Sequence, residues 1–203
     1  MCDDTFIYHA GTASFVSQDK KLIQEHNKYL FSNYPSQMRN VENYCKGNPN
    51  HIIQDNIELR LQILQILKNQ RKTILYQVQS DFREGTFDAI GGTQLHVKDL
   101  TEGLQNKYNI VVAARDEKWL NVTLYSDEKE VRLRFFIGLA VDYMPFRSVK
   151  FRKIYDHILE LFRIDLIHIH HVIGLTLELY YAGEAAGIPV ITTLHDFIAY
   201  VQV

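Results

Sequence analysis

From Lys72 onward the sequence alternates between short apolar runs and stretches with the three-to-four-residue apolar spacing of helices. The expected strands are 73–79, 110–114, 165–170 and 189–194, and the expected helices between them are 93–105, 148–162 and 175–186. Two further extended segments, 119–125 and 131–137, are expected to form a hairpin. Strands that alternate with helices build a parallel sheet covered on both faces. The sequence therefore predicts an α/β, Rossmann-like fold with a mostly parallel sheet and helices on both faces.

Residues 1–70 have a different character, because asparagine and glutamine are concentrated there and glycine is scarce. Apolar residues recur at helical spacing over 51–69, behind Asn50 as a candidate cap, and an earlier helix is expected over Lys20–Phe31. We therefore expect a helical, amide-rich N-terminal segment over 1–70. A Rossmann-like domain follows over 71–203, and we expect it to be incomplete at its C-terminus, because the chain stops soon after the last expected strand.

The charge balance excludes one class of function. The chain has 22 Lys and Arg against 24 Asp and Glu, a formal net charge of −2, so it is not a protein held on nucleic acid by bulk charge alone. No apolar run reaches the ~18 residues of a membrane span, and the first residues lack a signal-peptide pattern. We expect a cytoplasmic chain with no nucleic-acid partner and no transmembrane segment.

A pair of glycines opens the helix that follows the first strand. In an open α/β sheet, ligands bind beyond the carboxyl ends of the strands, where Gly91, Gly92 and Thr93 are expected to lie. Small residues and the free amides of a helix N-terminus favour a phosphate or another anion, although a flexible turn is the alternative. The stretch is neither a Walker loop nor a G-x-G-x-x-G fingerprint.

Histidines gather at the ends of two later strands. Because side chains alternate along a strand, His168 and His170 are expected on one face and His171 on the other. They are either a metal pair or structural histidines, and zinc would need further ligands. His195 and Asp196 close the last strand, where a histidine is well placed to contact a ligand and an aspartate can instead cap a following helix.

In order along the chain, four stretches carry a resemblance: 74–80, Gly91–Leu100, Ile164–His171 and Gly187–Phe197. Together they resemble the N-terminal, acceptor-side domain of the family 4 retaining glycosyltransferases, which have the GT-B fold of two Rossmann domains. The resemblance covers about residues 72–200, and residues 1–70 lie outside it.

The resemblance implies a role for each matching residue. The amides at Gly91, Gly92 and Thr93 would approach the phosphates of a nucleotide-diphosphate sugar. His195 would be the catalytic residue that contacts the transferred sugar. His171 and Asp196 would lie on the acceptor side, and His96 would line the crevice or pack its helix. The resemblance implies no metal and no cofactor.

One departure from the family pattern shapes the expected function. In the family a second Rossmann domain with a Glu-x7-Glu pair holds the donor, and no two glutamates here have that spacing. We expect a truncated N-terminal half, inactive without a C-terminal Rossmann domain or partner chain. Two alternatives stay open: a small metal-dependent hydrolase, or a non-catalytic module that binds a partner through residues 1–70. The hydrolase would use His168, His170, His195 and Asp196.

Overall fold

The computed structural model describes residues 19–83, 91–138 and 147–195. The chain forms two compact units, Met1–Gln54 and Asp55–Val203. The domain boundary predicted between residues 70 and 71 stays a prediction. Among the described residues, no helix combines the length and apolar character that crossing a membrane requires.

The first unit is helical in its described part. It contains α1 (Asp19–Asn33), α2 (Pro35–Gly47) and the start of α3 (His51–Leu67), so the two helices expected in this segment are confirmed. Helix α2 was not expected. Pro35 suits the first turn of a helix, where its missing N–H costs nothing. Asn48 ends α2 in a left-handed conformation (φ 36°) and donates its backbone N–H to the carbonyl of Tyr44, 2.9 Å away.

The second unit contains a six-stranded sheet in the order β4-β3-β2-β1-β5-β6. The strands are β1 (Thr73–Ser80), β2 (Asn109–Asp116), β3 (Trp119–Ser126), β4 (Lys129–Phe136), β5 (Leu166–Ile169) and β6 (Val190–Thr192). Strands β2, β1, β5 and β6 pair in parallel, while β3 and β4 form an antiparallel hairpin at the other edge. The α/β, Rossmann-like, mostly parallel fold is thereby confirmed.

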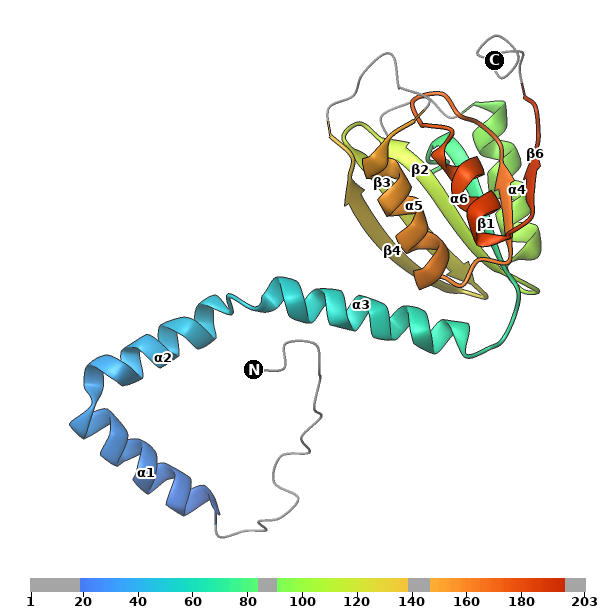
Figure 1. Ribbon diagram of the computed structural model, residues 1–203. Coiled ribbons are helices and arrows are strands. Elements are labelled where there is room, and N and C mark those ends of the chain that lie inside the picture. Colours follow the sequence, from blue (N-terminus) through green and yellow to red (C-terminus); the bar gives the residue numbers. More distant parts are fainter. Residues whose placement is uncertain (1–18, 84–90, 139–146, 196–203) are drawn as a thin grey trace. The chain divides into compact units, whose positions relative to one another are not determined.

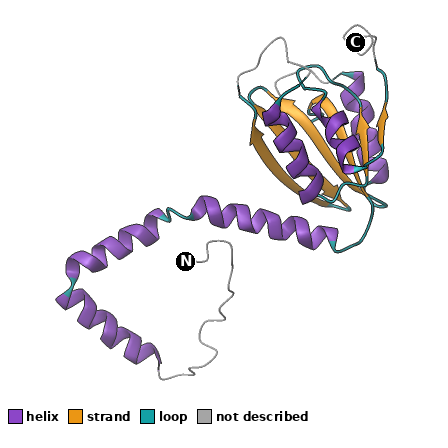
Figure 2. Ribbon diagram, in the orientation of Figure 1, coloured by secondary structure: helices purple, strands orange, loops and turns teal. Residues whose placement is uncertain are grey.

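Helices cover both faces of this sheet. Figure 1 shows α5 (Val149–Leu161) and α6 (Glu178–Ala186) on one face and α4 (Gly92–Leu104) on the other, and Figure 2 shows the strands between these layers. A separate hydrophobic core lies on each face of the sheet, and alternate residues of β1 point into one or the other. Tyr76 packs in the core that contains Val97 of α4, while Leu75 packs in the core that contains Tyr155 of α5. The C-terminal part of α3 adds Ile63 to this second core.

The strand order reverses between β1 and β5. From β1 the chain moves outward through β2, β3 and β4, then returns through α5 to place β5 on the opposite side of β1. The backbone N–H of His170 extends this pairing by donating to the carbonyl of Gln77, 2.9 Å away. In open α/β sheets, ligands bind beyond the carboxyl ends of the strands at such a reversal. We call the part of the molecule just beyond the C-terminal ends of β1, β5 and β6 the carboxyl edge.

Candidate functional site

The N-terminus of α4 is fixed to the end of β1 by one side chain. Gln94 accepts a hydrogen bond from the backbone N–H of Gly91 (3.1 Å) through Oε1 and donates one to Oγ of Ser80 (2.7 Å) through Nε2. Gln94 and Ser80 are both buried, so this link is shielded from water. The first backbone N–H groups of a helix have no partner within it and carry partial positive charge. The structure thus places the amides of Gly92 and Thr93 at the carboxyl edge.

The two glycines differ in what surrounds them. Among the described residues, a Cβ added to Gly92 would meet no atom within 4 Å, whereas one added to Gly91 would lie 3.1 Å from Oε1 of Gln94. Gly91 is extended (φ −108°), so its backbone conformation does not require glycine. Packing therefore does not explain glycine at position 92, and the space beside its backbone is open to a ligand.

Three imidazole rings meet at the carboxyl edge, and we call them the histidine cluster. They belong to His96 in α4, to His170 directly after β5 and to His195 after β6. The ring centroids are 5.5 Å apart for His96 and His170, 5.4 Å for His96 and His195, and 5.5 Å for His170 and His195. Nδ1 of His170 lies 3.2 Å from Nε2 of His195, within hydrogen-bonding distance.

A second layer of rings holds His170 in place. The ring of His168 lies 3.9 Å from that of His170, which confirms that these two side chains share one face of β5. Nε2 of His168 is 2.8 Å from Oγ1 of Thr193, so the ends of β5 and β6 are joined through side chains. The edge of Tyr76 also contacts His170, with centroids 5.4 Å apart. The position of His170 is therefore determined by packing.

His171 has a different environment. It is buried, and its Nδ1 accepts a hydrogen bond from the backbone N–H of Ile173, 3.0 Å away. Its carbonyl accepts from Nε2 of Gln77, whose Oε1 in turn accepts from the hydroxyl of Tyr155 in α5. These bonds fix the segment that follows β5 to the α5 face of the sheet.

Burial keeps the ring of His170 neutral. The pKa of His170 is lowered to about 3, mainly by burial and then by repulsion from His168, His195 and His96. Burial also lowers the pKa of His168, with a smaller contribution from His96 and His195. The two rings are therefore uncharged near neutral pH, and they act as hydrogen-bonding groups rather than as cations.

The structure groups the predicted residues differently from the sequence analysis. The ligand atoms of His96, His170 and His195 all lie within 4.8 Å of one another, whereas His168, named for the hydrolase alternative, turns to Thr193. Asp196, the fourth residue of that alternative, lies outside the described residues. The exposed ring of His96 belongs to the cluster. The resemblance implied that His96 lines the crevice or packs its helix, and the choice between the two could not be predicted because it depends on how α4 is rotated about its axis.

The loop after β1 begins with a charged anchor. Asp81 is buried, and its carboxylate accepts hydrogen bonds from the backbone N–H of Arg83 (3.1 Å) and from its Nε (2.8 Å). The same guanidinium reaches Glu130 on β4 through a second nitrogen, 2.9 Å away. This network fixes where the chain leaves the sheet on its way to α4.

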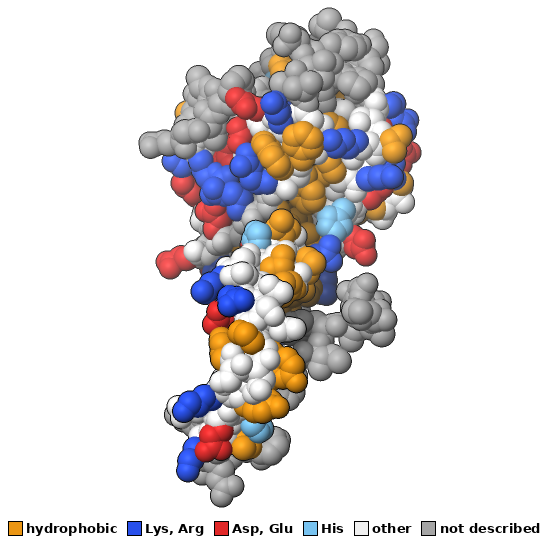
Figure 3. All heavy atoms as spheres, turned by 90° about the vertical axis from the view of Figure 1, so that its left-hand side faces the viewer, with side chains coloured by type: hydrophobic (Ala, Val, Ile, Leu, Met, Phe, Trp, Pro, Cys, Tyr) orange, Lys and Arg blue, Asp and Glu red, His pale blue; other side chains and the backbone are white. Residues whose placement is uncertain are grey.

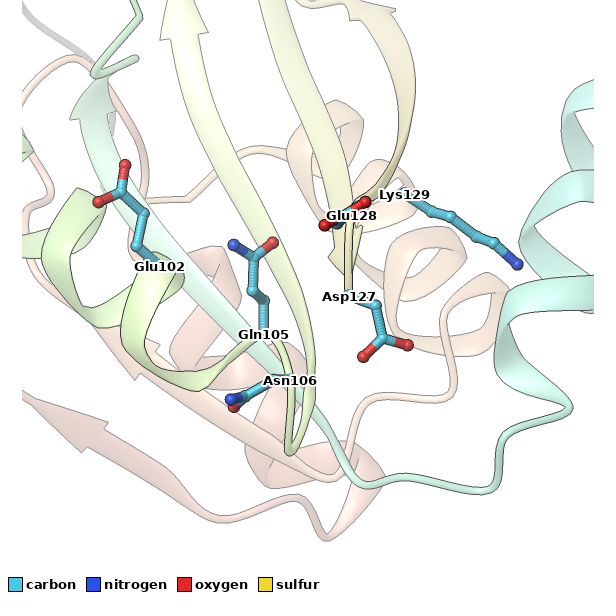
Figure 4. A pocket seen from close by; sticks show the side chains of 6 residues that line it. All are labelled: Glu102, Gln105, Asn106, Asp127, Glu128 and Lys129. Carbon is cyan, nitrogen blue, oxygen red and sulfur yellow. The ribbon is translucent and has the colours of Figure 1, made fainter.

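A polar hollow lies at the opposite end of the strands. Figure 4 shows its lining from the end of α4 and from the β3–β4 turn: Glu102, Gln105, Asn106, Asp127, Glu128 and Lys129. The backbone N–H of Asp127 donates to the carbonyl of Gln105, 2.9 Å away, and its carboxylate pairs with Arg71. Because the hollow lies at the amino ends of β1 and β2 and its acidic groups repel phosphate, we do not take it as the functional site.

The protein-family comparison matches the part of the chain that contains this site. The model of Glycosyltransferase Family 4 matches residues 90–202, more than half of the chain, including α4 and the strand ends that carry the histidine cluster. Comparison with curated proteins and with solved structures found no match. The resemblance inferred from the sequence is confirmed, and a glycosyltransferase domain implies a sugar donor and an acceptor. The chain belongs to Glycosyltransferase Family 4.

Proposed function

We propose that the carboxyl edge binds a nucleotide-diphosphate sugar, with the amides of Gly92 and Thr93 at the phosphates and His195 at the transferred sugar. The N–H of Gly91 donates to Oε1 of Gln94 instead, so Gly91 would offer the phosphates room rather than a hydrogen bond. The observation that carries the proposal is the histidine cluster, which lies at the reversal of strand order and includes a ring from α4 itself. Gly91 and His96 are five residues apart on this helix, about 7.5 Å along its axis. A diphosphate sugar is long enough to contact both.

The chemistry of glycosyl transfer fits these groups. When the bond between sugar and phosphate breaks, negative charge develops on the departing diphosphate and the sugar gains oxocarbenium character. Preoriented amides at a helix N-terminus stabilise the negative charge on the diphosphate, and no strong base is needed. His195, whose ring contacts neutral His170, would orient the sugar through a hydroxyl group.

The stereochemistry and the second domain are also part of the proposal. We propose transfer with retention, in which the acceptor hydroxyl attacks from the side of the leaving group. The nucleotide would be held by a second Rossmann domain, so the 203 residues alone would bind donor without turning it over. The acceptor-side roles of His171 and Asp196 stay predictions.

Pyrophosphate binding to the chain tests the phosphate site. We expect the amide resonances of Gly92 and Thr93 to shift on titration with pyrophosphate. Gly92→Ala should weaken binding about tenfold, ~1.4 kcal/mol, because the added methyl meets no atom of the described part of the chain but blocks the ligand. Gly103→Ala is the matched control, since it makes the same change in the same helix, also with no atom within 4 Å of the new Cβ. Equal binding by both variants would refute the phosphate role.

Transfer activity tests the catalytic assignment. The chain, joined to the C-terminal domain of a complete family member, should transfer sugar from UDP-glucose or GDP-mannose. His195→Ala should then lower the rate at least about 100-fold, the usual cost of losing a polar group at the reacting centre. His26→Gln in α1 is the control. Full activity of the His195 variant would reject its role, and transfer by the 203 residues alone would reject the need for a second domain.

A further inference from the structure

Three positively charged side chains lie over aromatic rings at the end of the sheet that carries the carboxyl edge. Strand β4 is antiparallel to β3, which is antiparallel to β2, so β4 ends at this end of the sheet, and α5 and α6 begin here. The described residues form cation–π pairs at no other place. We call these six residues the cation–aromatic belt: Arg134 over Trp119 (4.9 Å), Lys150 over Phe136 (4.7 Å) and Arg147 over Tyr181 (4.1 Å).

The three pairs are neighbours along one surface. Trp119 and Phe136 contact each other edge to face, with ring centroids 5.2 Å apart, and so connect the first two pairs. Lys150 lies in the first turn of α5 and Arg147 lies just before its N-cap, Ser148, so the start of α5 connects the second pair to the third. Figure 3 shows hydrophobic side chains bordered by Lys and Arg on the side of the second unit that carries β4.

Apolar side chains in and beside the belt are open to water. Phe136 is 53% exposed, and Val149, the first residue of α5, is 75% exposed. Single exposed apolar residues are common on protein surfaces, whereas neighbouring ones rimmed by polar groups mark an interaction site. Lys150 links these two, because it follows Val149 in the chain and lies over the ring of Phe136. The combination is an apolar protrusion with a cation beside it.

The stability of α5 does not explain a lysine at position 150. The N-terminus of a helix carries partial positive charge, so acidic residues are favoured there and basic residues are unfavourable. The first turn of α5 has no acidic residue. Arg152 is compensated by Asp156, 2.8 Å away on the next turn, whereas Lys150 turns to Phe136. Local preferences of this kind are broken mainly where a residue serves a function.

The charges of the belt favour an anionic surface over a single anion. The chain has a formal net charge of −2, yet the belt contains three cations. Arg134 pairs with Asp116 and Arg147 pairs with Glu178, but both arginines are exposed, so water screens these pairs and other anions can still approach. Each cation lies over its own ring, so the three do not converge on one point as binding of one phosphate would require. A row of separate cations with apolar side chains between them matches many anionic groups above an apolar layer.

We propose that the cation–aromatic belt docks the chain on a lipid bilayer that contains anionic lipids. The cations would contact the headgroups, and Phe136 and Val149 would enter the boundary between headgroups and acyl chains. Such docking needs no membrane-spanning helix, because its strength comes from buried apolar area together with attraction between basic residues and anionic lipids. The inference is independent of the proposed glycosyl transfer, since it requires neither a sugar donor nor a second domain.

The fluorescence of Trp119 tests the docking directly, because it is the single tryptophan of the chain and lies in the belt. Vesicles of equal parts phosphatidylglycerol and phosphatidylcholine should shift its emission to shorter wavelength, and bromine on the acyl chains should quench it. Vesicles of phosphatidylcholine alone should do neither. Cosedimentation with the anionic vesicles gives the partition coefficient, which should fall as salt screens the headgroups.

A charge reversal separates docking from folding. Lys150→Glu should lower the partition coefficient about 30-fold, because it replaces an attractive charge by a repulsive one. The variant should keep the circular dichroism and melting temperature of the parent, since glutamate is favoured in the first turn of a helix. Val149→Ser should lower the coefficient about threefold, by removing apolar area. Lys107→Glu is the matched control, because it makes the same charge change at an exposed position at the opposite end of the sheet.

Three outcomes would overturn the proposal. Failure of the parent chain to bind the anionic vesicles would do so, and would point to an acidic protein as the occupant of the belt. Binding that Lys150→Glu leaves undiminished, or that Lys107→Glu weakens equally, would do so because the belt would then have no specific part in it. None of these results bears on the pyrophosphate and transfer experiments.

Discussion

The two units of the chain use their apolar residues in opposite ways. In the second unit, large side chains such as Tyr76, Tyr155 and Phe162 are almost completely buried. In the first unit, none of the described residues from 21 to 54 is buried. Figure 3 shows hydrophobic side chains at the surface of this helical region. Tyr29 and Tyr44 are among the exposed residues of the first unit. Apolar composition alone therefore does not create a core, because the elements must also have surfaces to pack against.

Helix α3 contains both situations within seventeen residues. Ile53, near the start of the helix, is 60% exposed. Ile63, the same residue type ten positions later, is 0% exposed and belongs to the core of the second unit. Helices of this length without tertiary burial are marginal in water. The stability of α1, α2 and the first turns of α3 must then come from backbone hydrogen bonds and end contacts, such as Asn50 with the hydroxyl of Tyr44.

Amide hydrogen exchange should show the largest difference between the units. Amides in β1 and β2 are expected to exchange only through global unfolding, and those in α2 through local fraying. With a global stability of ~5 kcal/mol or more, the sheet amides should exchange at least about 1,000-fold more slowly. The measurement is residue-resolved exchange by NMR. Comparable protection in α2 would mean that this helix has a buried face, contrary to the comparison.

A matched pair of substitutions in α3 should sharpen the contrast. Ile63→Ala should lower the free energy of unfolding by ~2–5 kcal/mol, because it removes a fully buried side chain and leaves a cavity. Ile53→Ala, on the same helix, should change it by no more than ~0.5 kcal/mol, because the side chain is mostly exposed. Denaturant unfolding of both variants is the test, and equal losses would contradict it.

The fold was predictable where the apolar pattern is local. The expected helix 148–162 corresponds to α5, Val149–Leu161, and the expected strand 73–79 to β1, Thr73–Ser80. The ends of short strands were less predictable: 165–170 and 189–194 shorten to Leu166–Ile169 and Val190–Thr192. Asp165 and His170 still make single backbone hydrogen bonds to β1, but regular pairing stops before them. Where it stops is a tertiary property that the local pattern does not determine. Helix α2 was missed because its apolar residues are few and Pro35 resembles a helix breaker.

The site was predictable in outline but not in composition. Strand alternation correctly gave His168 and His170 a common face. It did not distinguish their partners, since His168 turns to Thr193 while His170 meets His195. The membership of His96 depends on the packing of α4 on β1, which is held by the link from Gln94 to Ser80. A single sequence contains no signal for that link.

A buried hydroxyl in the second unit has an exposed counterpart in the first. The hydroxyl of Tyr155 donates to Oε1 of Gln77, 2.8 Å away, in the interior. Tyr155→Phe should cost ~1–3 kcal/mol, because the glutamine oxygen loses a buried partner. Tyr29→Phe, in α1, should stay within ~0.5 kcal/mol, since Tyr29 is mostly exposed. Thermal unfolding of the two variants measures the difference, and a neutral Tyr155→Phe would show that water replaces the hydroxyl.

The smallest expected effect concerns a buried carboxylate in the first turn of α6. Burial tends to raise the pKa of Glu178. Hydrogen bonds from the backbone N–H of Ser148 (2.7 Å) and from Nε of Arg147 (3.0 Å) lower it by more than burial raises it, so the pKa lies below its ordinary value. Arg147 is largely exposed, so its ion pair is screened and the Ser148 bond dominates. Such an anchor has no counterpart among the described residues of α1 and α2, where no side chain is buried.

A lowered pKa gives this anchor a defined pH dependence. The stabilisation is present in full above the unfolded-state value of about 4.5 and disappears as the pH falls through the lower folded-state value, because the unfolded chain takes up the proton first. Glu178→Gln should therefore cost ~1 kcal/mol at neutral pH, and the difference from the parent should shrink below pH 4.5. Glu184→Gln, an exposed change on the same helix, should show neither effect. Unfolding curves at several pH values test this, and a difference that grows as the pH falls would mean that burial outweighs the two hydrogen bonds.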